Sequence, residues 1–333
     1  MKSIRSLKEF LVDYPHFRIA SLDDNSKVLD FYQKNVRTSP NSLIADRSPD
    51  FFKLLRDYSD SFYVIIGVDE SNEVDFVCSI TLSMTSSNKQ IGFLRDLRFT
   101  QNSPALLLNW VKLYSDFMQD YNSINEFQNL ERIFSLSYEV NESWKNIFSI
   151  FEKKNVFYHK IATIVEHTFS NDQINGPPIN SLYQIDASAH ASDKDIKQFI
   201  DQELVKSYLG RAMIIDQHLS EGIVCRDKYN NIVGLLITFD SSSARSWKSE
   251  GTQVSHLEAR ALIKNNLASN DKTAILESLI HAALTKANAN ISLLADENLL
   301  GRKNQRQVYD FYEITNLPQI KIDEYLGIFN IIN

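Results

Sequence analysis

Residues 61–84, SFYVIIGVDESNEVDFVCSITLSM, hold two apolar runs rich in β-branched and aromatic residues, with a polar segment between them. Such runs on either side of a polar turn predict a β-hairpin with strands at Ser61–Val68 and Val74–Met84. A third strand is expected at Ile91–Thr100, and Pro104–Tyr121 has apolar residues at helical spacing. The sequence therefore predicts a mainly antiparallel sheet that leads into a helix.

The rest of the first half can be interpreted in the same way. Phe17–Leu22 predicts a strand and Asn25–Lys34 a helix, and Ser48-Pro49 has the residue types of an N-cap and a first helical position. The remaining expected elements are a strand at Arg132–Val140, a helix at Glu142–Lys154 and a long strand at Val156–Phe169.

Residues 170–180, SNDQINGPPIN, break both helix and strand patterns, which predicts a linker at 171–181 between domains 1–170 and 182–333. Beyond it a similar order of elements recurs less clearly. The expected strands are Leu182–Ile185, Gly222–Asp227, Ile232–Phe239, Gln253–Ile263, Ile291–Ala295 and Gln319–Phe329, and the expected helices are Ser192–Ser207, Asp271–Ala287 and Arg302–Glu313. The repeated order predicts two similar α/β domains, with one large α/β domain as the alternative.

The composition limits the classes of function. A chain of 333 residues is long enough for two domains, and its net charge of −7 gives no basic excess for binding nucleic acid. Only two cysteines are present, which excludes a disulfide framework and indicates a reducing compartment, the cytoplasm. No apolar run is long enough to span a membrane, and the histidines lack metal-binding spacing, so we expect neither a membrane partner nor a metal site.

Two stretches of the first half resemble the GNAT superfamily of acyl-CoA-dependent N-acyltransferases. GFLRDLRF (92–99) resembles the fourth strand of that family, and Val140-Asn141 followed by FSIFEKKNVF (148–157) resembles its N…lYEKhGF segment. FYEITNL (311–317) resembles the second segment again, with Asn298 in the place of Asn141. The resemblance implies two GNAT-like domains, each a mixed, mainly antiparallel sheet flanked by helices. It also implies acetyl-CoA or another acyl-CoA as co-substrate and an amine of a small molecule or peptide as acceptor.

The segment after the fourth strand departs from the family pattern, which is Arg/Gln-x-x-Gly-x-Gly/Ala. Its glycines let backbone N–H groups approach a pyrophosphate at a helix N-terminus. Here Pro104 stands in place of the first glycine and removes one N–H donor, and the second half has no glycine in this segment either. By resemblance, the residues that contact the cofactor are Gln101, Asn102 and Ser103 in the first half and Ser269, Asn270, Lys272 and Thr273 in the second. Lys272 adds positive charge there, while Asp271 would repel a phosphate.

The candidate catalytic residues lie in the second half. The resemblance implies a tyrosine acid on the last helix of each domain, a position expected to hold Phe151 in the first half and Tyr312 in the second. His256 and Glu258 share one face of the expected fourth strand and are the candidate bases. The alternative for all three is structural, with Tyr312 anchoring a helix and the other two at the surface.

The first half lacks an obvious catalytic residue at the matching place. Asp96 occupies a comparable strand position there, but its neighbours Arg95 and Arg98 predict a surface ion pair. The sequence therefore favours an N-acyltransferase with acetyl-CoA as its default donor, that is, an acetyltransferase, with its chemistry in the second half. The alternatives are an inactive GNAT-like module that binds a ligand or protein, and a transferase whose donor is an acyl carrier protein.

Overall fold

The computed structural model describes residues 4–35, 44–57, 59–84, 90–100, 104–138, 142–170, 183–189, 194–204, 222–239, 246–249, 252–254, 256–264, 266–287, 289–296, 300 and 305–317. The chain divides into two compact units, unit 1 with residues 1–40, 46–161 and 310–323, and unit 2 with residues 41–45, 162–309 and 324–333. These units differ in their bounds from the expected domains 1–170 and 182–333, which stay a prediction: the division falls inside a strand, and a late segment belongs to unit 1. The expected linker 171–181 lies outside the described residues.

The sheet of unit 1 contains the predicted hairpin. Its first five strands lie in the order β1-β3-β4-β5-β6, with antiparallel pairs up to β5 and a parallel pair between β5 and β6. The backbone N–H groups of Ser71 and Glu73 donate to Asp69 in the hairpin turn, which explains why this polar segment turns. The strands are β1 (Phe17–Ile19), β3 (Ser61–Val68), β4 (Val74–Met84), β5 (Gln90–Phe99) and β6 (Leu130–Tyr138).

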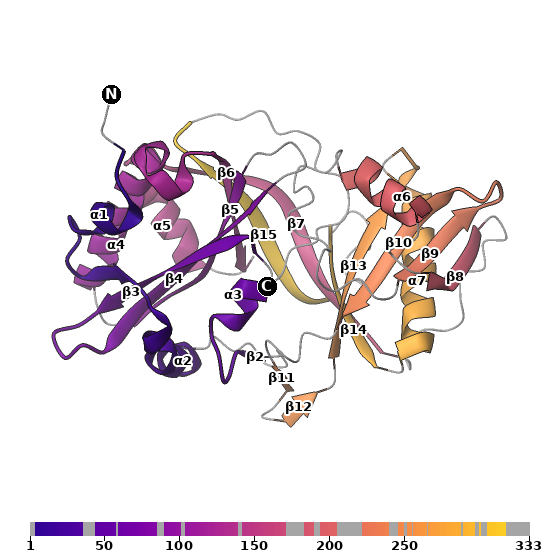
Figure 1. Ribbon diagram of the computed structural model, residues 1–333, viewed down its shortest axis with the longest axis horizontal. Coiled ribbons are helices and arrows are strands. Elements are labelled where there is room, and N and C mark those ends of the chain that lie inside the picture. The colour runs from indigo at the N-terminus through magenta and orange to yellow at the C-terminus, as the bar shows by residue number, and fades with distance from the viewer. Residues whose placement is uncertain are drawn as a thin grey trace. The chain divides into compact units, whose positions relative to one another are not determined.

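Helices cover both faces of this sheet (Figure 1). One apolar cluster joins the sheet to α1, α4 and α5, and another joins its opposite face to α2 and α3. The helices are α1 (Leu7–Leu11), α2 (Asn25–Lys34), α3 (Lys53–Asp57), α4 (Pro104–Asp120) and α5 (Glu142–Glu152), with 3-10 turns η1 (Leu22–Asp24), η2 (Tyr121–Ser123) and η3 (Asn125–Phe127). Unit 1 is therefore a three-layer α/β/α structure.

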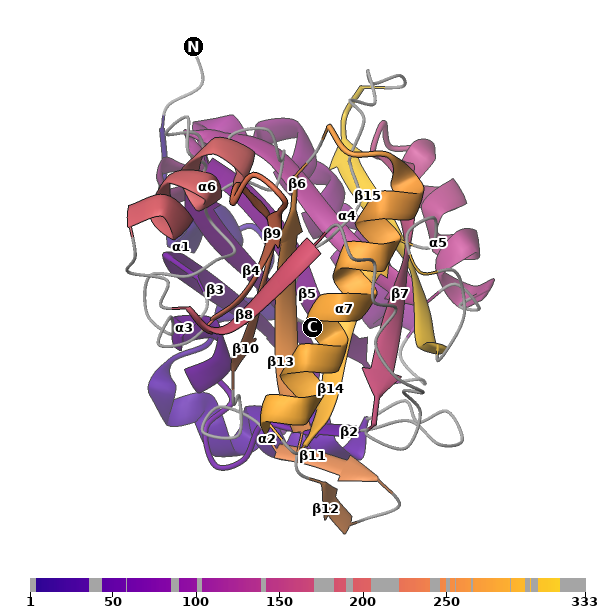
Figure 2. The same cartoon turned by 90° about the vertical axis from the view of Figure 1, so that its right-hand side faces the viewer.

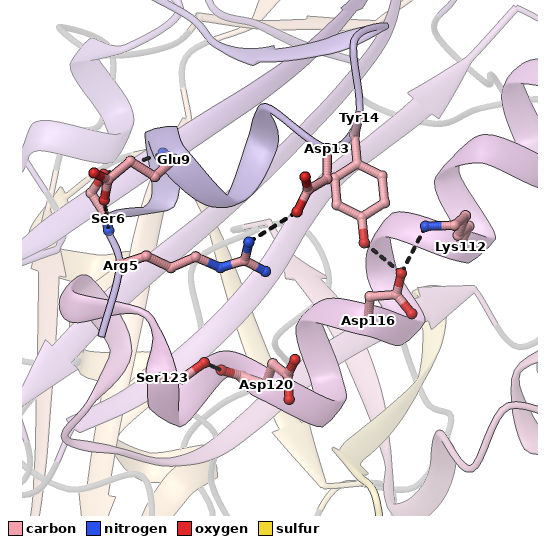
Figure 3. A network of polar contacts seen from close by, with 9 residues as sticks. All are labelled: Arg5, Ser6, Glu9, Asp13, Tyr14, Lys112, Asp116, Asp120 and Ser123. Atoms are coloured by element: carbon pink, nitrogen blue, oxygen red, sulfur yellow. Dashed lines mark hydrogen bonds and ion pairs between the residues drawn. The ribbon is translucent and has the colours of Figure 1, made fainter. Parts of the chain in front are cut away.

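Polar contacts fix the N-terminal segment against α4 (Figure 3). The hydroxyl of Tyr14 donates to Asp116 at 2.5 Å, and Lys112 contacts the same carboxylate at 3.0 Å. Arg5 pairs with Asp13 at 2.9 Å on the same side. With its apolar side chains buried in the cluster that α4 also enters, α1 is an integral part of unit 1.

Unit 2 has the same succession of strand pairs. Its strands lie in the order β8-β9-β10-β13-β14, antiparallel up to β13 and parallel between β13 and β14. They are β8 (Tyr183–Ala189), β9 (Gly222–Asp227), β10 (Ile232–Phe239), β13 (His256–Ile263) and β14 (Asn290–Asp296). A separate small sheet has the order β12-β11-β2, formed by β12 (Thr252–Val254), β11 (Ser246–Ser249) and β2 (Ile44–Asp46).

Two helices pack on opposite faces of the unit 2 sheet. The apolar side chains of α7 (Ser269–Ala287) form one cluster with β10, β13 and β14, and those of α6 (Lys194–Leu204) form another with β9 and β10. Figure 2 shows α7 lying along the strands. Gly234 permits this close approach, because a Cβ atom there would lie 2.6 Å from Ile275 Cγ2 of α7.

Two long strands belong to both units. In β7 (Phe157–Phe169), residues 157–161 are in unit 1 and 162–169 in unit 2, whereas in β15 (Gln305–Thr315), residues 305–309 are in unit 2 and 310–315 in unit 1. The order of strands is β6-β15-β7-β14. The last described strand of the chain thus completes the sheet of unit 1, and the strand that follows α5 pairs with β14 of unit 2.

Two sequence predictions of helices are wrong. Residues Arg302–Glu313 were expected to form a helix, but 305–315 form the strand β15, whose residues 309–314 are buried on both faces of the sheet. Ser48 does not cap a helix, because α3 begins only at Lys53. The preceding residues are instead held to α2, since the side chain of Asn25 accepts from Phe51 N–H and donates to the Pro49 carbonyl.

The last strand expected from the sequence, Gln319–Phe329, lies outside the described residues. None of the helices in the described ranges is both long enough and apolar enough to cross a membrane.

Candidate functional site

The parallel strands β13 and β14 of unit 2 separate part of the way along. Their pairing ends at Ala259 opposite Leu293, although β13 continues to Ile263 and β14 to Asp296. The outer edges of both strands stay paired, with β10 and β7 respectively. In this described part of the sheet, the two inner edges therefore face each other without pairing. Such an edge can bind an extended ligand that carries amide groups.

Helix α7 begins shortly after the end of β13 (Figure 2). Its first residues, Ser269 and Asn270, are exposed, and Lys272 and Thr273 are half-buried. The first N–H groups of a helix have no partner within it, and together with the helix dipole they attract anions. Lys272 adds a positive charge to this turn and Asp271 a negative one. The four residues that the sequence assigns to the cofactor in this half thus lie together at one helix end.

Glu258 is buried on the face of the sheet that α6 covers. Its side chain is 8% exposed. Arg260, two residues further along β13, pairs in register with Ile237, which packs in the same apolar cluster as α6. Because side chains alternate along a strand, Glu258 points to this face as well. The expectation of a solvated surface glutamate is wrong.

One buried carboxylate of unit 2 accepts hydrogen bonds from hydroxyl groups on two neighbouring strands. Glu166 of β7 is 5% exposed, and both of its oxygens accept hydrogen bonds. Ser292 Oγ of β14 donates to Oε1 at 3.2 Å, and the Tyr309 hydroxyl of β15 donates to Oε2 at 3.1 Å. Ser292 is also the register partner of Glu258 on β13. Buried polar side chains therefore extend across four adjacent strands.

The strands β5 and β6 of unit 1 separate in the same way. Their pairing ends at Leu94 opposite Ser135, while the strands continue to Phe99 and Tyr138. The separation begins next to Asp96, which has a positive φ of 57° where the register of β5 against β4 shifts. A bulge of this kind turns the strand and re-aims its side chains.

Asp96 is committed to a buried ion pair, which corrects the expected surface pair with Arg95 and Arg98. Its carboxylate accepts two bonds from Arg47, at 2.6 and 3.0 Å, and the two side chains are only 5% and 2% exposed. The Arg47 guanidinium also lies over the rings of Tyr32 and Phe51. Burial by itself would raise the pKa of the Asp96 carboxyl, but the charge of Arg47 holds that pKa below its ordinary value. Asp96 is therefore poorly suited to accept a proton.

Tyr312 does not lie on the kind of element expected for it. It lies on β15 within unit 1, not on a helix of the second half, so its equivalence to Phe151 of α5 is wrong. Its hydroxyl donates to Asp310 at 3.2 Å, and Asp310 in turn pairs with Lys160. Burial, and then the negative charge of Asp310, raises the pKa of the Tyr312 phenol, which makes it a weaker acid.

Four of the candidate residues lie wholly or partly outside the described residues. Gln101, Asn102 and Ser103 precede α4 and lie outside the described residues. His256 begins β13 opposite Asn290, with its backbone described and its side chain not. In the described part of the chain, no group of three or more His, Cys, Asp or Glu residues is arranged to hold a metal ion.

Sequence reasoning missed Glu166, Ser292, Tyr309 and Arg47. Ser292 lies between apolar residues in NISLLAD, whereas Glu166 is followed by the polar His167 and Thr168 in TIVEHTF. A polar residue at a position of a strand that is expected to be buried needs a hydrogen-bond partner, and this is the one local signal that could have identified these residues. Which partner it has depends on strand pairing between residues more than 100 positions apart, since 126 positions separate Ser292 from Glu166.

No family model matches the sequence, and no curated protein sequence matches it. Solved structures do match. A GCN5-related N-acetyltransferase from Sphaerobacter thermophilus superposes with a TM-score of 0.55 at 10% identity, over 91% of this chain and 96% of the other. A tandem GNAT protein from the clavulanic acid biosynthesis pathway gives 0.54 at 9% identity, over 91% and 99%.

The N-myristoyltransferase of Saccharomyces cerevisiae, solved with bound myristoyl-CoA, gives a TM-score of 0.52 at 11% identity, over 94% of this chain and 80% of the other. Identities this low establish the fold and not the activity. The mixed α/β sheets flanked by helices, as expected from the sequence, form a GNAT-like fold over most of the chain.

Proposed function

We propose that this chain, which has the fold of the GNAT N-acyltransferases, transfers an acyl group from acyl-CoA to an amine of a small molecule or peptide. The observation that carries the proposal is the separation of β13 and β14, next to a buried glutamate and followed by the start of α7. These features bring an amide-binding edge, a candidate base and an anion-binding helix end to one region of unit 2. Acetyl-CoA is the default donor.

In this proposal the separated strands hold the amide-containing arm of the donor. The exposed end of α7, with Ser269, Asn270, Lys272 and Thr273, binds its phosphates. The absence of glycine there limits how closely the backbone approaches, so side chains contribute more of the contact. N–H groups on the open edge of β13 then face the thioester carbonyl and stabilise the charge that develops on its oxygen.

Glu258 is the proposed base. It removes a proton from the acceptor ammonium, and the free amine attacks the thioester carbonyl. The new C–N bond forms, the C–S bond breaks as the tetrahedral intermediate collapses, and the coenzyme A thiolate takes up a proton. Unit 1 contributes to β7 and β15, the two strands that belong to both units and whose sharing is called the exchange of strands below. Its own Asp96 stays paired with Arg47.

One observation favours a second function, that of a module that binds a ligand without acyl transfer. The first turn of α7 contains Asp271 and the segment before it no glycine, and both features oppose phosphate binding. The donor then has a weaker site than in other proteins of this fold, or none.

Ligand-dependent unfolding separates the two functions. Acetyl-CoA at a hundred times its Kd should raise the free energy of unfolding by about 2.7 kcal/mol. Thermal unfolding is therefore measured with acetyl-CoA, a long-chain acyl-CoA and coenzyme A, and release of the free thiol is followed with a panel of amines. No stabilisation by any donor and no thiol release would contradict the transferase and leave the binding module.

A further inference from the structure

The carboxylate of Glu166 is held in one orientation by hydroxyl groups from two neighbouring strands. Ser292 Oγ donates to one of its oxygens at 3.2 Å and the Tyr309 hydroxyl to the other at 3.1 Å. All three side chains are buried, with exposed fractions of 5%, 7% and 6%. The bond from Tyr309 therefore fixes which oxygen of Glu166 faces Ser292.

Ser292 also stands beside Glu258. The two residues are register partners on parallel strands, so their side chains project from adjacent positions on the same face of the sheet. A hydroxyl donates one hydrogen bond and accepts others. Ser292 can therefore accept from a protonated Glu258 while it donates to Glu166.

A buried base can pass the proton it takes to a neighbouring carboxylate through a bridging hydroxyl group. We propose that Glu166 is a positioning residue that acts through Glu258, receiving its proton by way of Ser292 Oγ. The O–H bond of the Glu258 carboxyl breaks, an O–H bond forms at Ser292 as its own proton moves to Glu166 Oε1, and no electrons are transferred. This inference rests on the proposed function, because it takes Glu258 to be the base.

Other charged and titratable residues lie on the elements around this row of side chains. Arg260 lies on the same face of β13, and Glu203 of α6, which packs over this face, is buried with 2% exposure. His256 lies two residues before Glu258 on its strand. The Asp195–Arg226 ion pair lies between the start of α6 and β9. These groups are present in every variant compared below, so differences between variants report on Glu166 and Ser292.

The test compares Ser292→Ala with Ser292→Thr, which keeps the hydroxyl. Thr168→Val is the matched control, because Thr168 is the register partner of Ser292 on β7 and its hydroxyl has no hydrogen-bond partner among the described residues. We expect Ser292→Ala to lower kcat by at least ~10-fold with an unchanged KM for the donor, and to make kcat rise with the concentration of a small external buffer base. Ser292→Thr restores the rate and Thr168→Val leaves it unchanged.

A second measurement does not need turnover. The titration of the buried carboxyl groups is followed by infrared spectroscopy in the full chain without substrate. Glu166→Gln removes a nearby negative charge, so the pKa of Glu258 should fall and the acidic limb of the kcat profile should move to lower pH by the same amount. Thermal unfolding confirms that each variant is folded.

Unchanged kcat and pH profile in a folded, active Ser292→Ala variant would overturn the inference and leave the transferase standing. If the wild type neither binds acyl-CoA nor releases thiol, the proposed function fails. The infrared titration then still decides the coupling, and a Glu258 signal that does not move in Glu166→Gln overturns it.

Discussion

The hydroxyl of Tyr309 donates a hydrogen bond of 3.1 Å to Glu166, across 143 residues of chain. The contact exists because β7 and β15 lie side by side in the sheet. Each of these strands serves both units, so the buried polar row of unit 2 depends on the same exchange of strands that completes the sheet of unit 1.

The first prediction concerns this exchange. Deleting residues 305–333 removes β15, and with it the strand between β6 and β7. We expect the shortened chain to lose its cooperative thermal transition in both units, because each sheet is left with an open edge. Circular dichroism and hydrogen exchange of β4 and β10 measure this. A peptide of residues 305–317 should restore protection, and full protection of both strands without it would contradict the exchange.

The second prediction concerns the buried pair of Arg47 and Asp96. Asp96→Asn leaves the guanidinium buried without its charge partner, which we expect to lower the free energy of unfolding by about 3–5 kcal/mol at pH 7. The control is Asp30→Asn, which breaks an exposed pair with Lys34 and should have no measurable effect. Denaturant unfolding compares the two, and equal effects would mean that burial of the first pair has no energetic consequence.

The same pair makes stability depend on pH. Because the pKa of Asp96 is lower in the folded chain than in the unfolded chain, its contribution is fully present above the unfolded pKa of about 3.9 and is lost as the pH falls toward the folded pKa. The free energy of unfolding of the wild type should therefore fall as the pH decreases below about 4, and less steeply in Asp96→Asn. Parallel slopes would exclude Asp96 as a source of the pH dependence.

The third prediction separates Glu258 from Tyr312. Glu258→Gln removes the proposed base and should lower kcat by about 10²–10⁴-fold with acyl-CoA binding retained. Tyr312→Phe removes only the hydrogen bond to Asp310, so we expect a loss of stability of about 1 kcal/mol and little change in turnover. The two variants are compared by steady-state kinetics with any amine that the wild type acylates. A large loss of kcat in Tyr312→Phe would contradict this and support Tyr312 as the general acid.

The fourth prediction concerns the end of α7. Lys272→Ala removes the positive charge from its first turn and should weaken acyl-CoA binding about 2–5-fold, with a smaller effect at high salt. The control is Lys197→Ala, which removes the same type of charge from an exposed position on α6. Isothermal titration at two salt concentrations measures both. Equal affinities in the two variants would contradict the proposal that the phosphates bind at this helix end.

Local pattern was sufficient where apolar runs end at polar turn residues or recur at helical spacing. The hairpin strands have the predicted bounds because apolar runs flank a polar turn, and the helix Asn25–Lys34 has them because its apolar residues recur at the helical period. It failed for β15, where VYDFYEI at 308–314 is buried on both faces and shows no alternation. The likeness of FYEITNL to a helical segment of the family then favoured the wrong element.

The candidate site was predictable only in part. Placing Ser269, Asn270, Lys272 and Thr273 near one helix start needed no more than the local pattern. The burial of Glu258 and its neighbour Ser292 was not predictable, because both depend on which strands pair, and that is decided by contacts distant in sequence. Arg47 and Asp96 meet for the same reason, through packing of a loop against a bulge.

The exchange of strands has a consequence for synthesis on the ribosome. Unit 1 needs residues 310–315, which are translated about 150 residues after its penultimate segment ends at residue 161. At roughly 5–20 residues per second, the nascent chain would spend roughly 7–30 s with the edge of β6 open. An open strand edge is a template for pairing with other chains. During that interval the edge of β6 can pair with other chains, and once β15 is added the edge is closed.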